Sequence, residues 1–212
     1  MAQEPQPLTV DSTTVAKNPG GVHVQPLRWL LYYPLWPTIW TTSMLLCIYL
    51  AARIHWDFWI PAIVILFIHR LYWAHVRDQY LFGNITPGVV VSLDPLLIAV
   101  SADLTKGKGH YPAIKIVQKR LRCAELGTRV ATVSLYAPGL DLSHWADFDP
   151  QPVAYATTDR ATHARVLQSI TEKEWQQLTD NLAKVPQPYA PGLYPLDGKT
   201  VRVLKQSTEP IN

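Results

Sequence analysis

One segment of the chain concentrates the side chains that could do chemistry. Within residues 141–149 there are three carboxylates and one imidazole, namely Asp141, His144, Asp147 and Asp149. Such groups can bind a divalent cation or act in general acid–base catalysis. Their spacing matches no calcium loop, because the turn glycine and the terminal glutamate are both missing. The alternative is an ordered connection in which Trp145 and Phe148 pack and the polar groups satisfy turn amides.

Two histidines in an apolar stretch, His69 and His75, suggest a haem or pigment site, because histidine is unusual in such a setting. Six residues along a helix correspond to about 600°, so the two rings lie about 120° apart and cannot share one ligand. The apolar stretch that precedes them contains no histidine. We therefore expect no intrinsic cofactor.

A second polar segment, residues 106–110, has the composition of a phosphate-binding loop with the sequence KGKGH. A Walker loop needs Gly-Lys-Ser/Thr at the start of a helix, whereas a strand is expected to follow here. The segment is then either a turn with solvated lysines or a contact for anionic lipid. In the second case Lys106 and Lys108 would reach phospholipid headgroups from a membrane-tethered domain.

Nucleophilic catalysis has little support in the sequence. Ser134, Ser143 and Cys123 lie in none of the sequence patterns that activate a nucleophile. We assign no catalytic residue and favour a non-enzymatic role.

The elements that must position these side chains divide the chain into two unlike parts. The 212 residues are 48% hydrophobic and 17% charged, with a net charge of +3. This composition excludes a mostly disordered chain and offers no electrostatic footprint for nucleic acid. Two cysteines exclude a disulfide scaffold and a Cys-rich metal cluster. Six of the eight tryptophans lie between residues 29 and 73, where charges are almost absent.

That tryptophan-rich segment predicts two membrane-spanning helices. Trp29–Ala52 contains no charge, and Phe58–Val76 contains only Arg70. Each stretch is long enough for a hydrocarbon core of about 30 Å. The short link Arg53–Asp57 makes the two helices antiparallel neighbours. The alternative is a soluble protein that wraps an apolar hairpin on all sides, in which case the aromatic residues at the span ends would be coincidental.

Aromatic side chains and one arginine mark the ends of the expected spans. The residues expected at the membrane interface are Trp29, Trp36, Trp56, Trp59, Arg70, Tyr72 and Trp73. Small residues recur every four positions on the first span, at Ser43, Cys47 and Ala51. This spacing allows close helix packing, either against the second span or against another membrane protein.

The distribution of Lys and Arg predicts the orientation. The link between the spans has only Arg53, whereas the outer flanks have Lys17, Arg28, Arg70 and Arg77. This excess places both termini in the cytoplasm, with the protein in the inner membrane. Residues 1–26 lack the basic start and apolar core of a signal peptide and have the composition of a flexible tail.

Residues 27–82 are thus the expected hairpin, and residues 84–196 are the expected cytoplasmic α+β domain. The predicted strands are Gly88–Leu93, Leu96–Leu104, Ala113–Leu121, Thr128–Tyr136 and Pro152–Thr157. A helix capped by Thr158 or Asp159 should end near Ser169, and Thr171 and Glu174 form a capping box for another. Strands followed by helices, without βαβ alternation, predict a small antiparallel sheet or barrel-like domain with two C-terminal helices. Residues 197–212 are an expected tail, with one short strand at Thr200–Leu204.

Several sequence segments, taken with the two-span hairpin, resemble a bacterial, mainly actinobacterial, membrane-protein family of unknown function. They are residues 84–92 (NITPGVVVS), 144–150 (HWADFDP), 174–175 (EW) and 191–194 (PGLY). The likeness covers about residues 27–196. It implies an inner-membrane accessory protein and transfers no catalytic residue.

Three functional hypotheses follow from the sequence. The leading one is a non-catalytic accessory or assembly subunit that binds the lipid bilayer and other membrane-protein subunits, with a respiratory complex as one host. The second is a module that binds the membrane surface or anionic lipid through Lys106, Lys108 and their neighbours. The third is a metal-assisted hydrolase or transferase centred on residues 141–149.

Overall fold

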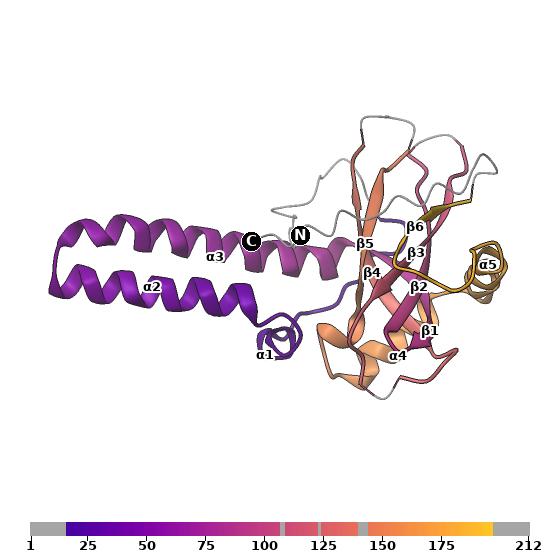
Figure 1. Ribbon diagram of the computed structural model, residues 1–212, viewed down its shortest axis with the longest axis horizontal. Helices are drawn as coiled ribbons and strands as arrows, with labels where there is room; N and C mark the ends of the chain where they lie inside the picture. The colour runs from indigo at the N-terminus through magenta and orange to yellow at the C-terminus, as the bar shows by residue number, and fades with distance from the viewer. Residues whose placement is uncertain (1–15, 107–108, 123, 140–143, 197–212) are drawn as a thin grey trace, which may run out of the picture.

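A computed structural model describes residues 16–106, 109–122, 124–139 and 144–196. Its described part is a two-helix hairpin that projects from a curled antiparallel sheet (Figure 1). Two C-terminal helices, α4 (Arg160–Ser169) and α5 (Glu172–Leu182), follow the long strands of the sheet. The predicted α+β class and the antiparallel sheet with two C-terminal helices are therefore confirmed.

The hairpin consists of α2 (Leu35–Arg53) and α3 (Trp59–Phe82), joined by the short 3-10 helix η1 (Trp56–Phe58). α3 ends where the sequence predicts, at Gly83, whose N–H donates to the carbonyl of Gln79. A side chain at position 83 would collide with that same carbonyl, so the chain needs glycine to turn from the helix into the first strand.

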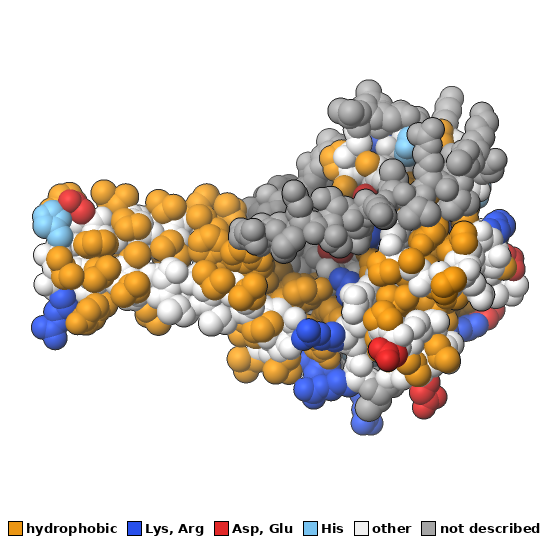
Figure 2. All heavy atoms as spheres, in the orientation of Figure 1, with side chains coloured by type: hydrophobic (Ala, Val, Ile, Leu, Met, Phe, Trp, Pro, Cys, Tyr) orange, Lys and Arg blue, Asp and Glu red, His pale blue; other side chains and the backbone are white. Residues whose placement is uncertain are grey.

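Both hairpin helices are long and apolar enough to cross a membrane, judged by length and composition. Their large apolar side chains are exposed along almost the whole projection, as Figure 2 shows in orange. The most exposed are Leu35, Leu45, Leu46, Tyr49, Ile54, Trp56, Ile60, Ile63 and Phe67. Within the part of the chain that the structure describes, the domain does not wrap the hairpin, as the alternative of a buried hairpin would require.

The sheet has six strands in the order β5-β4-β1-β2-β3-β6, and each neighbouring pair is antiparallel. The strands are β1 (Asn84–Leu93), β2 (Leu96–Asp103), β3 (Pro112–Gln118), β4 (Arg129–Ala137), β5 (Asp147–Pro152) and β6 (Gly192–Pro195). Phe148 of β5 packs in the same apolar cluster as Leu193 of β6, although these strands are opposite edges of the sheet. The sheet therefore curls and encloses a small core on its concave face.

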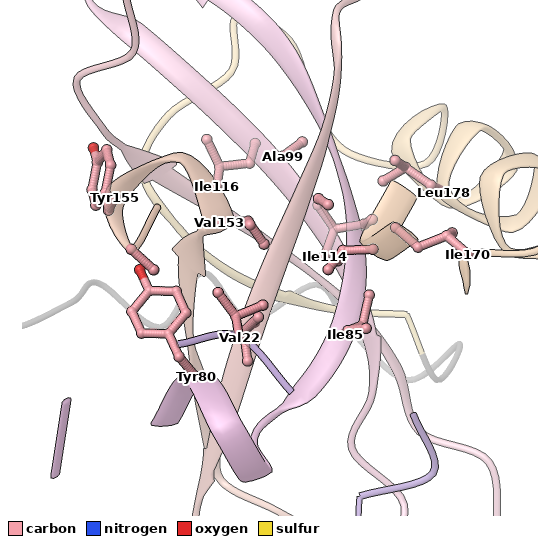
Figure 3. Packing of buried hydrophobic residues seen from close by; sticks show 14 of the residues in the cluster. Val22, Tyr80, Ile85, Ala99, Ile114, Ile116, Val153, Tyr155, Ile170 and Leu178 are labelled. Atoms are coloured by element: carbon pink, nitrogen blue, oxygen red, sulfur yellow. The ribbon is translucent and has the colours of Figure 1, made fainter. Parts of the chain in front are cut away.

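The other face of the sheet carries the larger core. Ile85, Ala99, Ile114 and Ile116 alternate with the concave-face residues and pack with α4, α5 and the end of α3 (Figure 3). Because both faces are covered, strand residues of either parity are buried. In β3 this buries all five residues from Ala113 to Val117.

One strand prediction is wrong, one strand was not predicted, and one strand is longer than predicted. Pro152–Thr157 is not a strand: β5 ends at Pro152, and residues Val153–Tyr155 form the 3-10 helix η2. β6 was not among the predicted strands, although it lies within the expected domain of residues 84–196. β1 begins at Asn84 and includes Pro87. Pro87 is paired with β4, but the pairing of β1 with β2 begins only after it, at Gly88. A proline is tolerated there because one side of the strand needs no donor from it.

The two C-terminal helices begin as predicted. Asp159 caps α4 by accepting from the N–H groups of Ala161 and Thr162. Thr171 and Glu174 form the capping box of α5. Trp175 and Leu178 of α5 are buried against the sheet, which matches their predicted helical spacing.

Residues 18–25, within the expected N-terminal tail, pack on the domain. Gly20, Gly21 and Val22 donate backbone hydrogen bonds to the carbonyls of the last turn of α3, and Val22 is fully buried beside Tyr80 (Figure 3). A side chain at Gly20 would collide with the carbonyl of Tyr80. This segment therefore joins the hairpin base to the domain and leads into α1 (Pro26–Leu30).

Candidate functional site

The richest group of polar side chains lies at one end of the curled sheet, where β2 and β4 end and β3 and β5 begin. We call this the open end and define it by the described residues of 103–112 and 136–147. A cavity of about 1260 Å³ extends over it, lined among others by Asp103, His110, Tyr136 and Asp147. A concave site with a few converging polar groups is the default place to look for ligand binding.

A buried lysine lies beneath the open end. Lys115 of β3 points into the concave face, is 3% exposed, and has its Nζ 2.8 Å from each carboxylate oxygen of Asp147. The same ammonium donates to the Phe148 carbonyl at 2.6 Å. Lys115 alternates with Ile114 and Ile116 along β3, as a solvent-facing residue would, but the curl of the sheet encloses it. A buried ammonium needs such partners, so Asp147 is committed to an ion pair.

Three buried hydroxyls lie next to this pair on the concave face. The Thr86 Oγ1 is 2.8 Å from Thr132 Oγ1 and 2.7 Å from Ser134 Oγ, and Thr132 Oγ1 donates to the Thr86 carbonyl. These contacts link β1 to β4 and satisfy one another. Among the described residues the Ser134 hydroxyl contacts another hydroxyl, that of Thr86, and not a base that could activate it as a nucleophile.

Two loops meet above the cavity. The rings of Tyr111 and His144 stack at 4.9 Å, and Thr105 and His144 form an isolated β-bridge. Lys106 places its Nζ 4.7 Å from the centre of the Trp145 ring. The structure therefore brings the predicted residues Lys106, His144 and Asp147 to the same end of the sheet.

Asp103 organises the loop that follows β2. Its carboxylate accepts from the N–H groups of Thr105 and Tyr111, and it lies 3.2 Å from His110 Nδ1. Burial alone would raise the pKa of the Asp103 carboxyl, but the hydrogen bonds from Thr105, Tyr111 and His110 hold it below its usual value. The carboxylate thus acts as the acceptor that closes a turn.

The metal hypothesis gains no ligand set from the described residues, which contain no group of three or more His, Cys, Asp or Glu side chains able to hold a metal. Asp147 binds Lys115, and Asp149 accepts from the Gln151 amide at 2.9 Å. Asp141 lies outside the described residues, as do Lys108, Cys123 and the strand expected at 200–204. A metal site at residues 141–149 stays a prediction.

The residues predicted for the membrane interface occupy different environments. Trp56 and Trp59 are exposed at the turn of the hairpin, and Arg70 is exposed on α3. Trp29 is 5% exposed, and its indole N–H donates to the Tyr72 hydroxyl at 2.7 Å. Trp36 stacks on Trp40. The remaining predicted interface residue, Trp73, donates its indole N–H to His69 Nε2 at 3.0 Å.

The small-residue positions of α2 lie on its less exposed side. Ser43, Cys47 and Ala51 are half-buried, whereas the neighbouring Leu45 and Leu46 are exposed. α2 packs along α3, and this partial burial fits packing of the stripe within the hairpin.

An aromatic and polar junction between hairpin and domain was missed from the sequence. Trp29 stacks on Tyr33 at 4.6 Å, and the Tyr33 hydroxyl meets both Lys119 Nζ at 3.1 Å and Gln151 Oε1 at 3.1 Å. Burial, reinforced by the charge of Asp149, raises the pKa of Tyr33 to about 12. Burial also lowers the pKa of Lys119, while Asp149 partly offsets this effect. The only sequence signal was the clustering of tyrosines before the first span.

The fold and these sites define a class of protein: an exposed apolar helical hairpin fixed to a curled antiparallel sheet domain. Among the described residues, no group of three or more His, Cys, Asp or Glu side chains could hold a metal ion.

The chain belongs to the DUF3239 family, a family described as proteins of unknown function, whose model matches residues 72–186. The expected membership of a family of unknown function is therefore confirmed, and the match spans the end of α3, the long strands and both C-terminal helices. No curated protein matches the chain. Among solved structures it is similar to the crystal structure of a proposed membrane protein from Corynebacterium diphtheriae, with 20% identity and a TM-score of 0.46. That match covers 53% of this chain and 99% of the other.

Proposed function

We propose that the hairpin crosses the inner membrane twice and that the protein is a non-catalytic accessory or assembly subunit of a larger membrane complex. The observation that carries the proposal is the exposed apolar surface of α2 and α3. In water such a surface is costly, because apolar area gains about 25 cal/mol per Å² when it leaves water. A bilayer, with or without a partner protein, is the environment that covers it.

The helix lengths support two crossings. The 19 residues of α2 and the 24 residues of α3 correspond to about 28 Å and 36 Å. The hydrocarbon core is about 30 Å thick. The extra length of α3 lies at its C-terminal end, where Val76 and Tyr80 are buried in the domain. The helix can thus cross the core and still anchor the domain.

The charges support a cytoplasmic domain. The turn of the hairpin carries Arg53, beside His55 and Asp57, which lie 3.0 Å apart. The base of the hairpin carries Arg28, Arg70 and Arg77, of which Arg77 pairs with the buried Asp78. The larger number of arginines at the base favours that side as cytoplasmic.

The subunit role is supported by how the polar groups are used. The Lys115–Asp147 pair, the three hydroxyls and the Asp103 turn all stabilise the domain itself. A stable domain on a rigid anchor suits a protein that positions or holds a larger partner, and a respiratory complex is one candidate host.

Cysteine labelling tests the topology. In a background with Cys47→Ala and Cys123→Ser, single cysteines replace Ile54 at the turn and Lys184 after α5. A membrane-impermeant maleimide should label Ile54→Cys in intact spheroplasts and Lys184→Cys only after lysis. The reverse pattern would overturn the orientation, and equal labelling of both in intact spheroplasts would overturn two crossings.

Gentle extraction tests the subunit role. After crosslinking in the membrane and then solubilisation in a mild detergent, the chain should migrate on native gels in a complex well above its own 23.9 kDa. A stable lone monomer under every mild condition would contradict an accessory role while leaving the topology intact.

A further inference from the structure

We propose that the loop after β3 forms a binding site for the headgroup of an anionic phospholipid at the base of the hairpin. The site is a shallow cavity of about 480 Å³ lined by Leu96, Gln118, Lys119, Arg120 and Leu121. We call it the basal cavity. It differs from the position of Lys106, which lies at the open end of the sheet. The inference rests on the proposed membrane crossing and adds a ligand to it.

A chain of contacts fixes the basal cavity at the level where α3 leaves its apolar surroundings. Lys119 Nζ bonds the Tyr33 hydroxyl, Tyr33 stacks on Trp29, and Trp29 bonds the Tyr72 hydroxyl. The exposed apolar residues of α3 extend up to Leu71, immediately before Tyr72. The cavity therefore lies beside the plane where a bilayer would change from hydrocarbon to headgroups, a layer about 5 to 7 Å deep.

The charges around the basal cavity have one predominant sign. Within 119–122, the sequence Lys-Arg-Leu-Arg supplies three cations and no carboxylate. Arg28 lies close by, because its Nε bonds the Ala154 carbonyl and its guanidinium lies over Tyr32, which stacks on Tyr155. The Arg120 N–H in turn donates to the Tyr155 hydroxyl at 2.8 Å.

Cationic side chains also gather beside the hairpin base near α1 in Figure 2. The acidic groups on the neighbouring segments are Asp94, two residues before Leu96, Asp149, whose charge acts on Lys119, and Glu125, further along the same loop, against the four cations Arg28, Lys119, Arg120 and Arg122. They leave a net positive charge at the cavity, which favours a phosphate group.

The chemistry of the cavity matches an amphipathic ligand. Arg120 and Arg122 are exposed and offer guanidinium donors to phosphate oxygens, while Leu96 and Leu121 offer apolar contact. Lys119 uses two of its three ammonium donors on Tyr33 and Gln151, which leaves one for a phosphate oxygen. The cavity volume of about 480 Å³ is many times the roughly 30 Å³ that one water occupies, so the cavity is large enough for a phosphodiester group.

The test measures lipid selection by the full chain in nanodiscs that contain spin-labelled phosphatidylglycerol or phosphatidylcholine. The wild-type protein should immobilise phosphatidylglycerol about fivefold more than phosphatidylcholine, as expected for one added basic contact at the membrane surface. The variant Arg120→Gln/Arg122→Gln should lose most of this preference. Arg122→Gln alone, which changes an exposed side chain, covers the case in which the double variant fails to fold.

Two matched controls make the result specific to the basal cavity. Lys173→Gln/Lys184→Gln removes two charges on and after α5, on the far side of the sheet from the hairpin, and should keep the full preference (Figure 1). Lys106→Gln, at the open end, should also keep it. No preference in the wild type, an unchanged preference in both Arg variants, or an equal loss in either control would overturn the inference. The maleimide labelling scores membrane crossing separately, so a failure of either idea is recognisable on its own.

Discussion

The hairpin and the sheet are built from the same apolar residue types, but the hairpin exposes them and the sheet buries them. Ile63 on α3 is 64% exposed and Phe67 is 63% exposed, whereas Ile98 and Ile114 in the sheet are fully buried. α2 and α3 are apolar on nearly every side, and a helix of that kind is stable only inside a membrane or a large protein. The sheet instead encloses its apolar residues on both faces. Residue type alone therefore does not indicate the environment; the distribution around each element does.

The largest difference between the two regions should come from truncating a side chain in the sheet core. Ile114→Ala should lower the free energy of unfolding by about 2 to 5 kcal/mol, because it removes buried methylene groups and leaves a cavity. Leu45→Ala, the matched change on exposed α2, should cost less than about 1 kcal/mol. Urea titration of the detergent-solubilised chain, followed by tryptophan fluorescence, measures both. Equal losses would show that the hairpin has a packed core of its own.

A charged side chain should impair membrane insertion when it is placed on the hairpin but not when it is placed on the domain. Phe67→Asp should disfavour membrane insertion by about 3 kcal/mol, since Phe67 is at the middle of the proposed second span and a carboxylate near the bilayer centre is costly. The same apolar-to-Asp change at Leu93, an exposed position in the domain, should leave insertion unchanged. The fraction that resists carbonate extraction reports the difference. If Phe67→Asp stays fully integrated, α3 does not face hydrocarbon at that position.

Inside the domain, the Lys115–Asp147 pair tests whether burial or charge dominates. Asp147→Ala should cost about 2 kcal/mol, below the usual 3 to 5 for a buried pair because Asp147 is 39% exposed. The double variant Lys115→Met/Asp147→Ala should recover most of the loss, since it leaves no unpaired buried ammonium. A double variant as unstable as the single one would show that the ion pair itself stabilises the fold.

The last effect appears only at alkaline pH and concerns the junction between the two regions. With a pKa of about 12 in the folded protein, against about 10 in the unfolded chain, Tyr33 keeps its proton in the folded state at alkaline pH. Its contribution to stability is complete below pH 10 and is lost as pH rises from about 10 to 12. Tyr33→Phe should flatten the fall of unfolding free energy over this range by about 1.4 kcal/mol per pH unit. An unchanged slope in alkaline urea titrations would contradict the burial of this hydroxyl.

Local signals predicted the elements whose ends depend on neighbouring residues. The Thr171–Glu174 capping box, the Asp159 cap and the end of α3 at Gly83 each follow from hydrogen bonds within a few residues. The hairpin was equally accessible, because its two apolar runs and short link are continuous in the sequence.

Features that depend on contacts across the sheet were not predictable in the same way. Lys115 alternates with Ile114 and Ile116 as a solvent-facing residue would, and only the curl of the sheet brings Asp147 to its ammonium. β5 contains three prolines or aspartates in its first four residues, so its composition indicated a loop, yet pairing with β4 makes it a strand. The junction at Tyr33 likewise joins residues more than eighty positions apart.

The unbroken course of α3 has a mechanical consequence. The helix runs from the turn at Trp59 to Phe82, and Tyr80 near its end donates to the Pro152 carbonyl within the domain core. The helix therefore continues without a break from its exposed apolar part into the domain. In the proposed two-span arrangement, a bilayer thickness that changes the tilt of the helix would rotate the whole domain with it and so would set the angle between the domain and the membrane.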